Sequence, residues 1–175
     1  MSRLLFIGDS LIEFFDWESR FPEHTVYNLG IAGETVNGLS RRLDCVLREL
    51  DMVDRVFIMS GINNLAMEDS SFIGTYREIV RAMAARYPAA QIVVQSLLPV
   101  LYPFISNDDI REMNRRLKSL AADEGVSYVN IHDHFLDDNG NPDPFCLVED
   151  GVHISNNGYR IWSAEIEKLL YPAAG

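Results

Sequence analysis

The chain has 175 residues, 47% of them hydrophobic and 23% charged, a balance typical of one soluble globular domain. We therefore interpret residues 1–175 as a single domain. Its 15 basic and 26 acidic residues give a formal net charge of −11, which disfavours nucleic acid as a partner because phosphates are also negative. No apolar stretch has the length of a membrane span, and the one before Gly8 is too short for a signal peptide. We thus expect a cytoplasmic protein without stable membrane insertion.

Two cysteines are too few for a disulfide framework. Cys45 occupies an apolar position of a predicted helix, where we expect a buried free thiol. The sequence is compatible with a homo-oligomer and does not decide the oligomeric state.

Short apolar runs alternate with helical patterns along the chain. A weak helix from Leu11 to about Glu18 follows the first run, and a helix opened by Thr35 follows the second. Helical stripes over 76–87 and 110–121 follow the third and fourth runs, and a last helix, capped by Ser155, follows the fifth. The five runs, which we interpret as strands, are Leu4–Ile7, Val26–Leu29, Arg55–Met59, Gln91–Gln95 and Ser127–Ile131. This order predicts a five-stranded parallel sheet between two helical layers, a three-layer α/β/α arrangement.

In such sheets, ligands bind beyond the carboxyl ends of the strands. Any residues that do chemistry are therefore expected in the loops that follow the strands. These loops contain "GDS" at 8–10, "GIAGET" at 30–35, "SGINN" at 60–64, "LLPVLYPFISN" at 97–107 and "EDGVHIS" at 149–155.

These loops hold a candidate for each part that cleavage of an ester by serine requires. Ser10 is a candidate nucleophile at the start of a helix, and His153 is a candidate base. Asp150, three residues earlier, is placed to orient that imidazole. The N–H of Gly33 and the side-chain amide of Asn63, with the N–H of Ser10 itself, are candidate donors to an oxyanion.

At this point the sequence resembles the SGNH hydrolases, also called the GDSL esterases and lipases. The resemblance rests on four blocks in the family's order: "GDSL" at 8–11, "NLGIAGET" at 28–35, "GINN" at 61–64 and "DGVH" at 150–153. It implies a flavodoxin-like sheet, with Ser10 as nucleophile and oxyanion donor and with Gly33 and Asn63 as the other donors. It also implies His153 as general base and Asp150 as the residue that orients it.

The third block departs from the family in one residue. The family usually has Gly-x-Asn-Asp there, and in this chain Asn64 stands in place of the final aspartate. That aspartate is normally a supporting residue, so the departure concerns the geometry of the loop more than the chemistry.

Simpler interpretations accompany the catalytic one. Asp9 or Ser10 could serve as a helix cap, and Glu13 and Glu34 could favour nearby helix N-termini. Cys146 is a weaker candidate nucleophile, because nothing in the sequence orients it. The apolar loop at 97–107 either folds over the core or forms a wall for an acyl group, with Phe145 and Val152 as further candidates for that wall.

Two alternative functions belong to other classes. One is a metal-dependent phosphoesterase that uses the carboxylates and imidazoles of Asp9, His132, His134, Asp150 and His153. The other is a non-catalytic binding module on the same fold.

The leading prediction is a serine esterase that hydrolyses small or short-acyl carboxylic esters through an acyl-enzyme on Ser10. The brevity of the chain resembles that of the acetylhydrolase and lysophospholipase-like members of the family, and thioesters are further candidate substrates. The prediction involves a small-molecule ester as the partner and neither a metal nor a cofactor.

Overall fold

In the computed structural model, which describes residues 1–171, five parallel strands form one sheet in the order β2-β1-β3-β4-β5. The strands are β1 (Arg3–Gly8), β2 (Thr25–Gly30), β3 (Arg55–Met59), β4 (Gln91–Gln95) and β5 (Ser127–Val129). This is the strand order of flavodoxin-like sheets, so the predicted fold class is confirmed.

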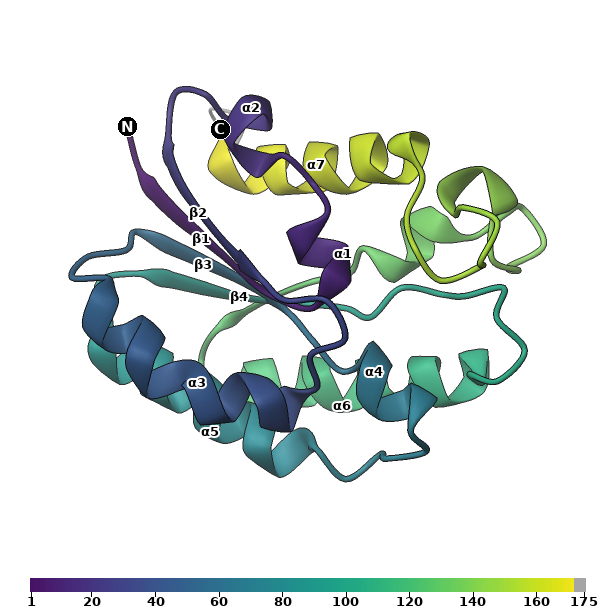
Figure 1. Cartoon of the computed structure of the whole chain (residues 1–175), viewed down its shortest axis with the longest axis horizontal. Helices are drawn as coiled ribbons and strands as arrows, with labels where there is room; N and C mark the ends of the chain where they lie inside the picture. The colour runs from purple at the N-terminus through teal and green to yellow at the C-terminus, as the bar shows by residue number, and fades with distance from the viewer. Residues whose placement is uncertain (172–175) are drawn as a thin grey trace.

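Helices cover both faces of the sheet (Figure 1). On one face lie α1 (Ser10–Glu13), α2 (Trp17–Arg20) and α7 (Asn156–Leu170). On the other lie α3 (Val36–Glu49), α4 (Ile62–Ala66), α5 (Ile73–Arg86) and α6 (Asn107–Asp123). Two short 3₁₀ helices, η1 (His132–Phe135) and η2 (Pro144–Cys146), precede α7. None of the helices within residues 1–171 is long and apolar enough to cross a bilayer.

Local signals place the helix ends where the sequence predicts them. The Thr35 hydroxyl accepts the Gly38 N–H at the start of α3, and the Ser155 hydroxyl accepts the Gly158 N–H at the start of α7. The apolar stripes of these helices are buried against the sheet, in a core that includes all of β1 from Leu4 to Ile7.

Two of the predicted element bounds are wrong. The strand predicted to reach Ile131 ends at Val129, because the N–H groups of Ile131 and His132 turn away to the Ser96 hydroxyl. The helix predicted from Leu11 to about Glu18 is two helical turns, α1 and α2, because the side chain of Asp16 caps a new helix.

Cys45 is exposed rather than buried, although it is a free thiol as expected. It lies beside the buried stripe of α3, and its thiol contacts the Glu49 carboxylate at 3.3 Å.

The sheet has its topological switch point between β1 and β3. The chain leaves β1 for β2 on one side and later returns to β3 on the other, so the carboxyl ends of β1 and β3 are neighbours. Gly8 is paired with Met59 in this register. The loops that contain Ser10 and Asn63 therefore start side by side, at the position where such folds bind ligands.

Candidate active site

Ser10 is presented by the sharp turn from β1 into α1. Asp9 is the helix cap: its carboxylate accepts the Leu11 N–H at 3.0 Å, which leaves the Ser10 hydroxyl uncommitted to capping. As the first residue of α1, Ser10 has an N–H without an acceptor inside the helix. Its hydroxyl oxygen lies 3.1 Å from Nε2 of His153.

His153 is held by a tight turn that begins at Asp150. One oxygen of the Asp150 carboxylate accepts the N–H groups of Val152 and His153, both at 2.8 Å. Gly151 has a φ of 73°, in the left-handed region that favours glycine. A Cβ on Gly151 would also lie 2.9 Å from the backbone of Leu101, so glycine is required for space as well.

The second Asp150 oxygen lies 2.6 Å from Nδ1 of His153. Partial burial raises the pKa of Asp150, but hydrogen bonds from the Val152 and His153 N–H groups and from the ring outweigh it, so the pKa is lowered. An ionised carboxylate only accepts hydrogen bonds, so Nδ1 is the donor to Asp150, and the tautomer with its proton on Nδ1 has a lone pair on Nε2 that can accept from the Ser10 hydroxyl. The structure thus joins Ser10, His153 and Asp150 in one hydrogen-bonded chain.

Gly33 lies in the loop between β2 and α3, with a φ of 74°. A Cβ on Gly33 would have no neighbour within 4 Å, so open space lies in front of it. No protein group among residues 1–171 accepts its N–H. Asn63, on α4, donates one of its two side-chain N–H bonds to the Glu34 carbonyl at 3.0 Å. The second N–H is left for another acceptor.

The departure at Asn64 has a structural explanation. Its side-chain oxygen accepts the Val36 N–H at the start of α3 at 2.9 Å, a contact that an aspartate would also make. Its NH₂ group, which an aspartate lacks, donates to the Asp69 carboxylate at 2.8 Å. Asn64 is 2% exposed, so Asp69 satisfies a donor that would otherwise be buried without a partner.

The apolar loop after β4 both covers the core and faces solvent. Leu97, Leu98, Val100 and Ile105 are buried. The exposed hydrophobic side chains of this loop are Leu101, Tyr102 and Phe104. The Leu101 N–H donates to the Gly151 carbonyl at 2.7 Å, which brings the loop against the turn that carries His153.

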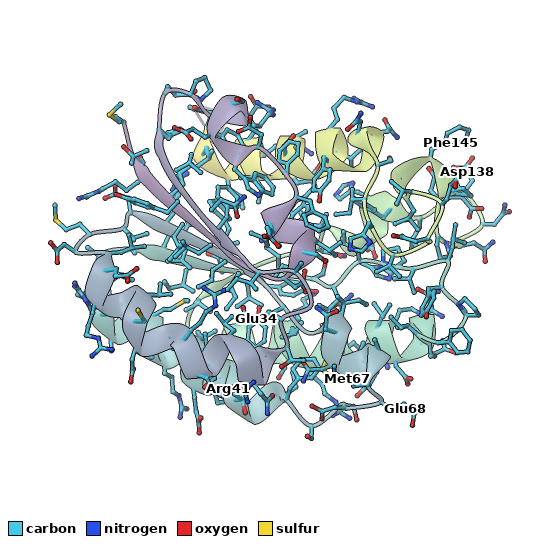
Figure 2. All side chains as sticks on the ribbon, in the orientation of Figure 1. Glu34, Arg41, Met67, Glu68, Asp138 and Phe145 are labelled. Atoms are coloured by element: carbon cyan, nitrogen blue, oxygen red, sulfur yellow. The ribbon has the colours of Figure 1, made fainter. Side chains whose placement is uncertain are left out.

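Two phenylalanines project near this end of the molecule. The ring of Phe14 lies 5.4 Å from the His153 ring and is 58% exposed. Phe145, which is 80% exposed, lies at the outer margin of the molecule (Figure 2).

The candidate ligands for a metal are not gathered at one place. His132 lies with Asp133, His134 with Glu165, and His153 with Asp150, in three separate pairs. Within residues 1–171, no three histidines, cysteines or carboxylates form a group that could hold a metal ion. Cys146 is buried, and burial raises the pKa of its thiol.

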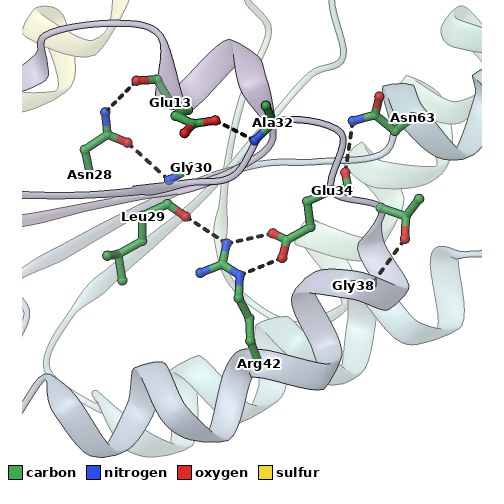
Figure 3. Close-up of polar contacts among 10 residues, drawn as sticks. Glu13, Asn28, Leu29, Gly30, Ala32, Glu34, Gly38, Arg42 and Asn63 are labelled. Carbon is green, nitrogen blue, oxygen red and sulfur yellow. Dashed lines mark hydrogen bonds and ion pairs between the residues drawn. The ribbon is translucent and has the colours of Figure 1, made fainter.

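Two acidic residues have partners that sequence patterns do not reveal. Glu34 binds Arg42 through both carboxylate oxygens, and Glu13 accepts the Ala32 N–H at 2.5 Å (Figure 3). These contacts are additional to the expected position of both residues near helix N-termini. Arg42 was not expected at the site at all, because no motif or spacing links it to the loop that contains Gly33.

A comparison with protein families identifies the family of this chain. The model of the GDSL-like lipase/acylhydrolase family matches residues 6–161, a range that includes Ser10, Gly33, Asn63, Asp150 and His153. The chain belongs to the GDSL-like lipase/acylhydrolase family. As a member of this family, it is a hydrolase of ester bonds.

Known structures support this assignment at the level of the fold. The chain is 28% identical to a Streptococcus pneumoniae protein named, provisionally, as a platelet activating factor, with a TM-score of 0.87 over 96% of this chain and 83% of the other. An acetyl-xylooligosaccharide esterase from Geobacillus stearothermophilus, in mutant form, is 21% identical, with a TM-score of 0.80 over 99% of this chain and 96% of the other.

One curated relative has a different name. An N-acylneuraminate cytidylyltransferase from Escherichia coli O18:K1:H7 is 26% identical over 177 residues, which cover 97% of this chain. The match covers only 41% of that relative, so this chain spans about two fifths of its length.

Proposed function

We propose that this GDSL-family hydrolase cleaves small, short-acyl carboxylic esters through an acyl-enzyme on Ser10. The observation that carries the proposal is the chain of hydrogen bonds from the Ser10 hydroxyl through His153 to Asp150, at 3.1 Å and 2.6 Å. This arrangement has the geometry of an activated nucleophile: a hydroxyl, a base within reach of it and a carboxylate that orients the base.

The proposed reaction has two halves. Ser10 Oγ attacks the carbonyl carbon while its proton moves to Nε2 of His153, and the N–H groups of Ser10, Gly33 and Asn63 stabilise the oxyanion. His153 then gives the proton to the leaving alcohol. In the second half, His153 takes a proton from water, the hydroxide attacks the acyl-enzyme, and the proton returns to Ser10 as the carboxylic acid leaves.

Exposure at the site supports a short acyl group. The side chains of Asp150 and His153 are 50% and 36% exposed, so this half of the site is open to solvent. Phe14 and Leu101 supply apolar surface beside the His153 turn but are themselves 58% and 49% exposed. Such open flanks suit an acetyl or similarly short group better than a long chain, which would gain little burial there.

The decisive experiment combines turnover with covalent labelling. We expect Ser10→Ala to melt at the wild-type temperature and to lose nearly all hydrolysis of p-nitrophenyl acetate. A fluorophosphonate should label wild-type Ser10, as read by mass spectrometry of the intact chain and its peptides, and should leave the variant unlabelled. Full activity in Ser10→Ala would end the proposal.

Two further measurements discriminate against the other function classes. A metal-dependent phosphoesterase would hydrolyse p-nitrophenyl phosphate and lose that activity with a chelator, whereas we expect the acetate activity to persist in the chelator. A binding module would show neither turnover nor labelling.

A further inference from the structure

The segment that carries Gly33 is held mainly by side chains from other elements (Figure 3). We call residues 30–35 the Gly33 loop; it connects the end of β2 to the cap of α3. Its own main-chain contacts include Ile31 N–H to the Gly8 carbonyl at 2.9 Å and Glu34 N–H to the Ile31 carbonyl at 3.1 Å. A loop with so little regular structure needs other contacts to keep an N–H group aimed at one point.

The strongest of these contacts is an ion pair. Arg42 Nε and Nη2 donate to the two Glu34 carboxylate oxygens, both at 2.6 Å, and Nη2 also donates to the Leu29 carbonyl at 2.7 Å. The Arg42 and Glu34 side chains are only 20% and 7% exposed, less than the partners in any other arginine–carboxylate pair of residues 1–171. A planar, two-pronged contact of this kind fixes geometry as well as charge.

Glu34 also links two of the proposed oxyanion donors, the side-chain amide of Asn63 and the main-chain N–H of Gly33. Its carbonyl accepts one N–H of Asn63 at 3.0 Å, and its peptide nitrogen is bonded to Gly33. The orientation of the Asn63 amide and the position of the Gly33 peptide therefore depend on the same residue. Arg42 holds the side chain of that residue from α3, and Glu13 holds the neighbouring Ala32 N–H from α1.

We infer that Arg42 is a positioning residue for ester hydrolysis: through Glu34 it sets the Gly33 N–H and the Asn63 amide for the oxyanion. This inference rests on the proposed function, because it assumes an oxyanion at that point. Arg42 makes its contacts with Glu34 and Leu29, so its effect is indirect. An oxyanion donor displaced by about 1 Å can cost about 100-fold in rate, so the loop needs such a support.

The simpler alternative is that the ion pair only attaches α3 to the end of β2. That role predicts a loss of stability without a change in the chemistry of the folded enzyme. Two measurements distinguish these roles. The first is kcat, which reports transition-state stabilisation once substrate is bound. The second is whether the effects of substitutions at Arg42 and Asn63 on activity are independent of each other.

The experiment compares Arg42→Ala with Arg77→Ala in steady-state hydrolysis of p-nitrophenyl acetate. Arg77 is a matched control because it also bridges two elements through carboxylates, at 2.6 Å and 3.0 Å to Glu124 and Asp123. We expect Arg42→Ala to lower kcat about 10- to 100-fold with little change in KM, and to slow fluorophosphonate labelling of Ser10. Arg77→Ala should keep the wild-type kcat.

A double variant gives the sharper test. If Arg42 acts through the oxyanion donors, Arg42→Ala combined with Asn63→Ala should lose less activity than the product of the two single losses. Wild-type kcat in folded Arg42→Ala, or losses that multiply in the double variant, would overturn the inference. Should Arg42→Ala not fold, Arg42→Lys takes its place, and wild-type kcat in that variant has the same meaning.

Failure of the proposed function would look different. Ser10→Ala would then retain hydrolysis, whatever the Arg42 variants do.

Discussion

Asp9 is a carboxylic acid buried directly beside the proposed nucleophile. One of its oxygens accepts the Leu11 N–H, and the other is buried without a protein partner. Burial raises the pKa of Asp9 to about 7, against the opposing effects of the Leu11 N–H and of His153. The sequence predicts Asp9 as a cap, and the structure confirms this. The burial of its second oxygen depends instead on how α1 packs on the sheet.

This burial predicts a pH-dependent stability that Asp9→Asn removes. In the folded protein the pKa of Asp9 is about 7, above its ordinary value of 3.8, because the fold favours the protonated carboxyl. The stability that this protonated form contributes is therefore fully present below about pH 4 and is lost as pH rises through about 7. We expect the unfolding free energy of wild type to fall relative to Asp9→Asn between about pH 4 and pH 8, by at most about 4 kcal/mol. Urea titrations at several pH values measure it.

The control for this prediction is Asp138→Asn, the same change at an exposed loop residue. That variant should follow the wild-type curve. Parallel curves for wild type and Asp9→Asn would show that Asp9 does not carry the pH dependence.

At the scale of elements, the register between β1 and β3 is set at the end of the sheet opposite the active site. Asp54, just before β3, accepts the Arg3 N–H at 2.7 Å and two guanidinium N–H bonds at 2.9 and 2.8 Å. The Arg3 carbonyl accepts the Asp54 N–H in return. Because parallel pairing continues from this contact to Gly8 and Met59, it places the loops of Ser10 and Asn63 beside each other.

The contact between Arg3 and Asp54 predicts an acid-sensitive stabilisation. The Arg3 side chain and N–H lower the pKa of Asp54 to about 2, below its ordinary value of 3.8. The stabilisation is therefore present above about pH 4 and is lost as pH falls through about 2. Since Asp54 is 39% exposed, we expect Asp54→Asn to lose only about 1 kcal/mol at neutral pH.

Chemical denaturation at neutral and acid pH tests this prediction, with kcat measured in parallel. The deficit of Asp54→Asn should shrink toward zero near pH 2, while Asp108→Asn, in an exposed ion pair on α6, should change little at either pH. A deficit that is constant with pH would contradict an electrostatic origin.

At the scale of the whole molecule, the net charge is −11, and the candidate site itself contains a carboxylate, Asp150, in its hydrogen-bonded chain. A negative field repels anionic substrates before they bind, and salt screens that repulsion. The same charge leaves the approach of a neutral ester unaffected. We therefore expect the net charge to disfavour anionic esters relative to uncharged ones.

We expect kcat/KM for mono-p-nitrophenyl succinate, an anionic ester, to be lower than for neutral p-nitrophenyl acetate at low salt. The ratio between the two should narrow between about 0.01 M and about 0.5 M NaCl, because the screening length falls several-fold over that range. The acetate ester is the internal control, and equal salt dependence of both substrates would contradict a role for the molecular charge.

Local patterns in the sequence determined the order of strands and helices, the caps Thr35 and Ser155, and the loops in which the candidate residues lie. They do so because periodicity and capping depend on near neighbours, and because parallel strands bring their carboxyl ends to one edge. The proposed roles of Ser10, Gly33, Asn63, Asp150 and His153 follow from those loops and the family blocks.

Only the tertiary structure decided which groups meet across distant segments. The ion pair of Arg42 with Glu34, the contact of Asn64 with Asp69 and Val36, and the buried second oxygen of Asp9 belong to this class. So does the end of β5, where the hydroxyl of Ser96, the residue that directly follows β4, accepts the next two N–H groups. Each depends on the distance and direction between side chains after packing, which the spacing of residues along the chain does not encode.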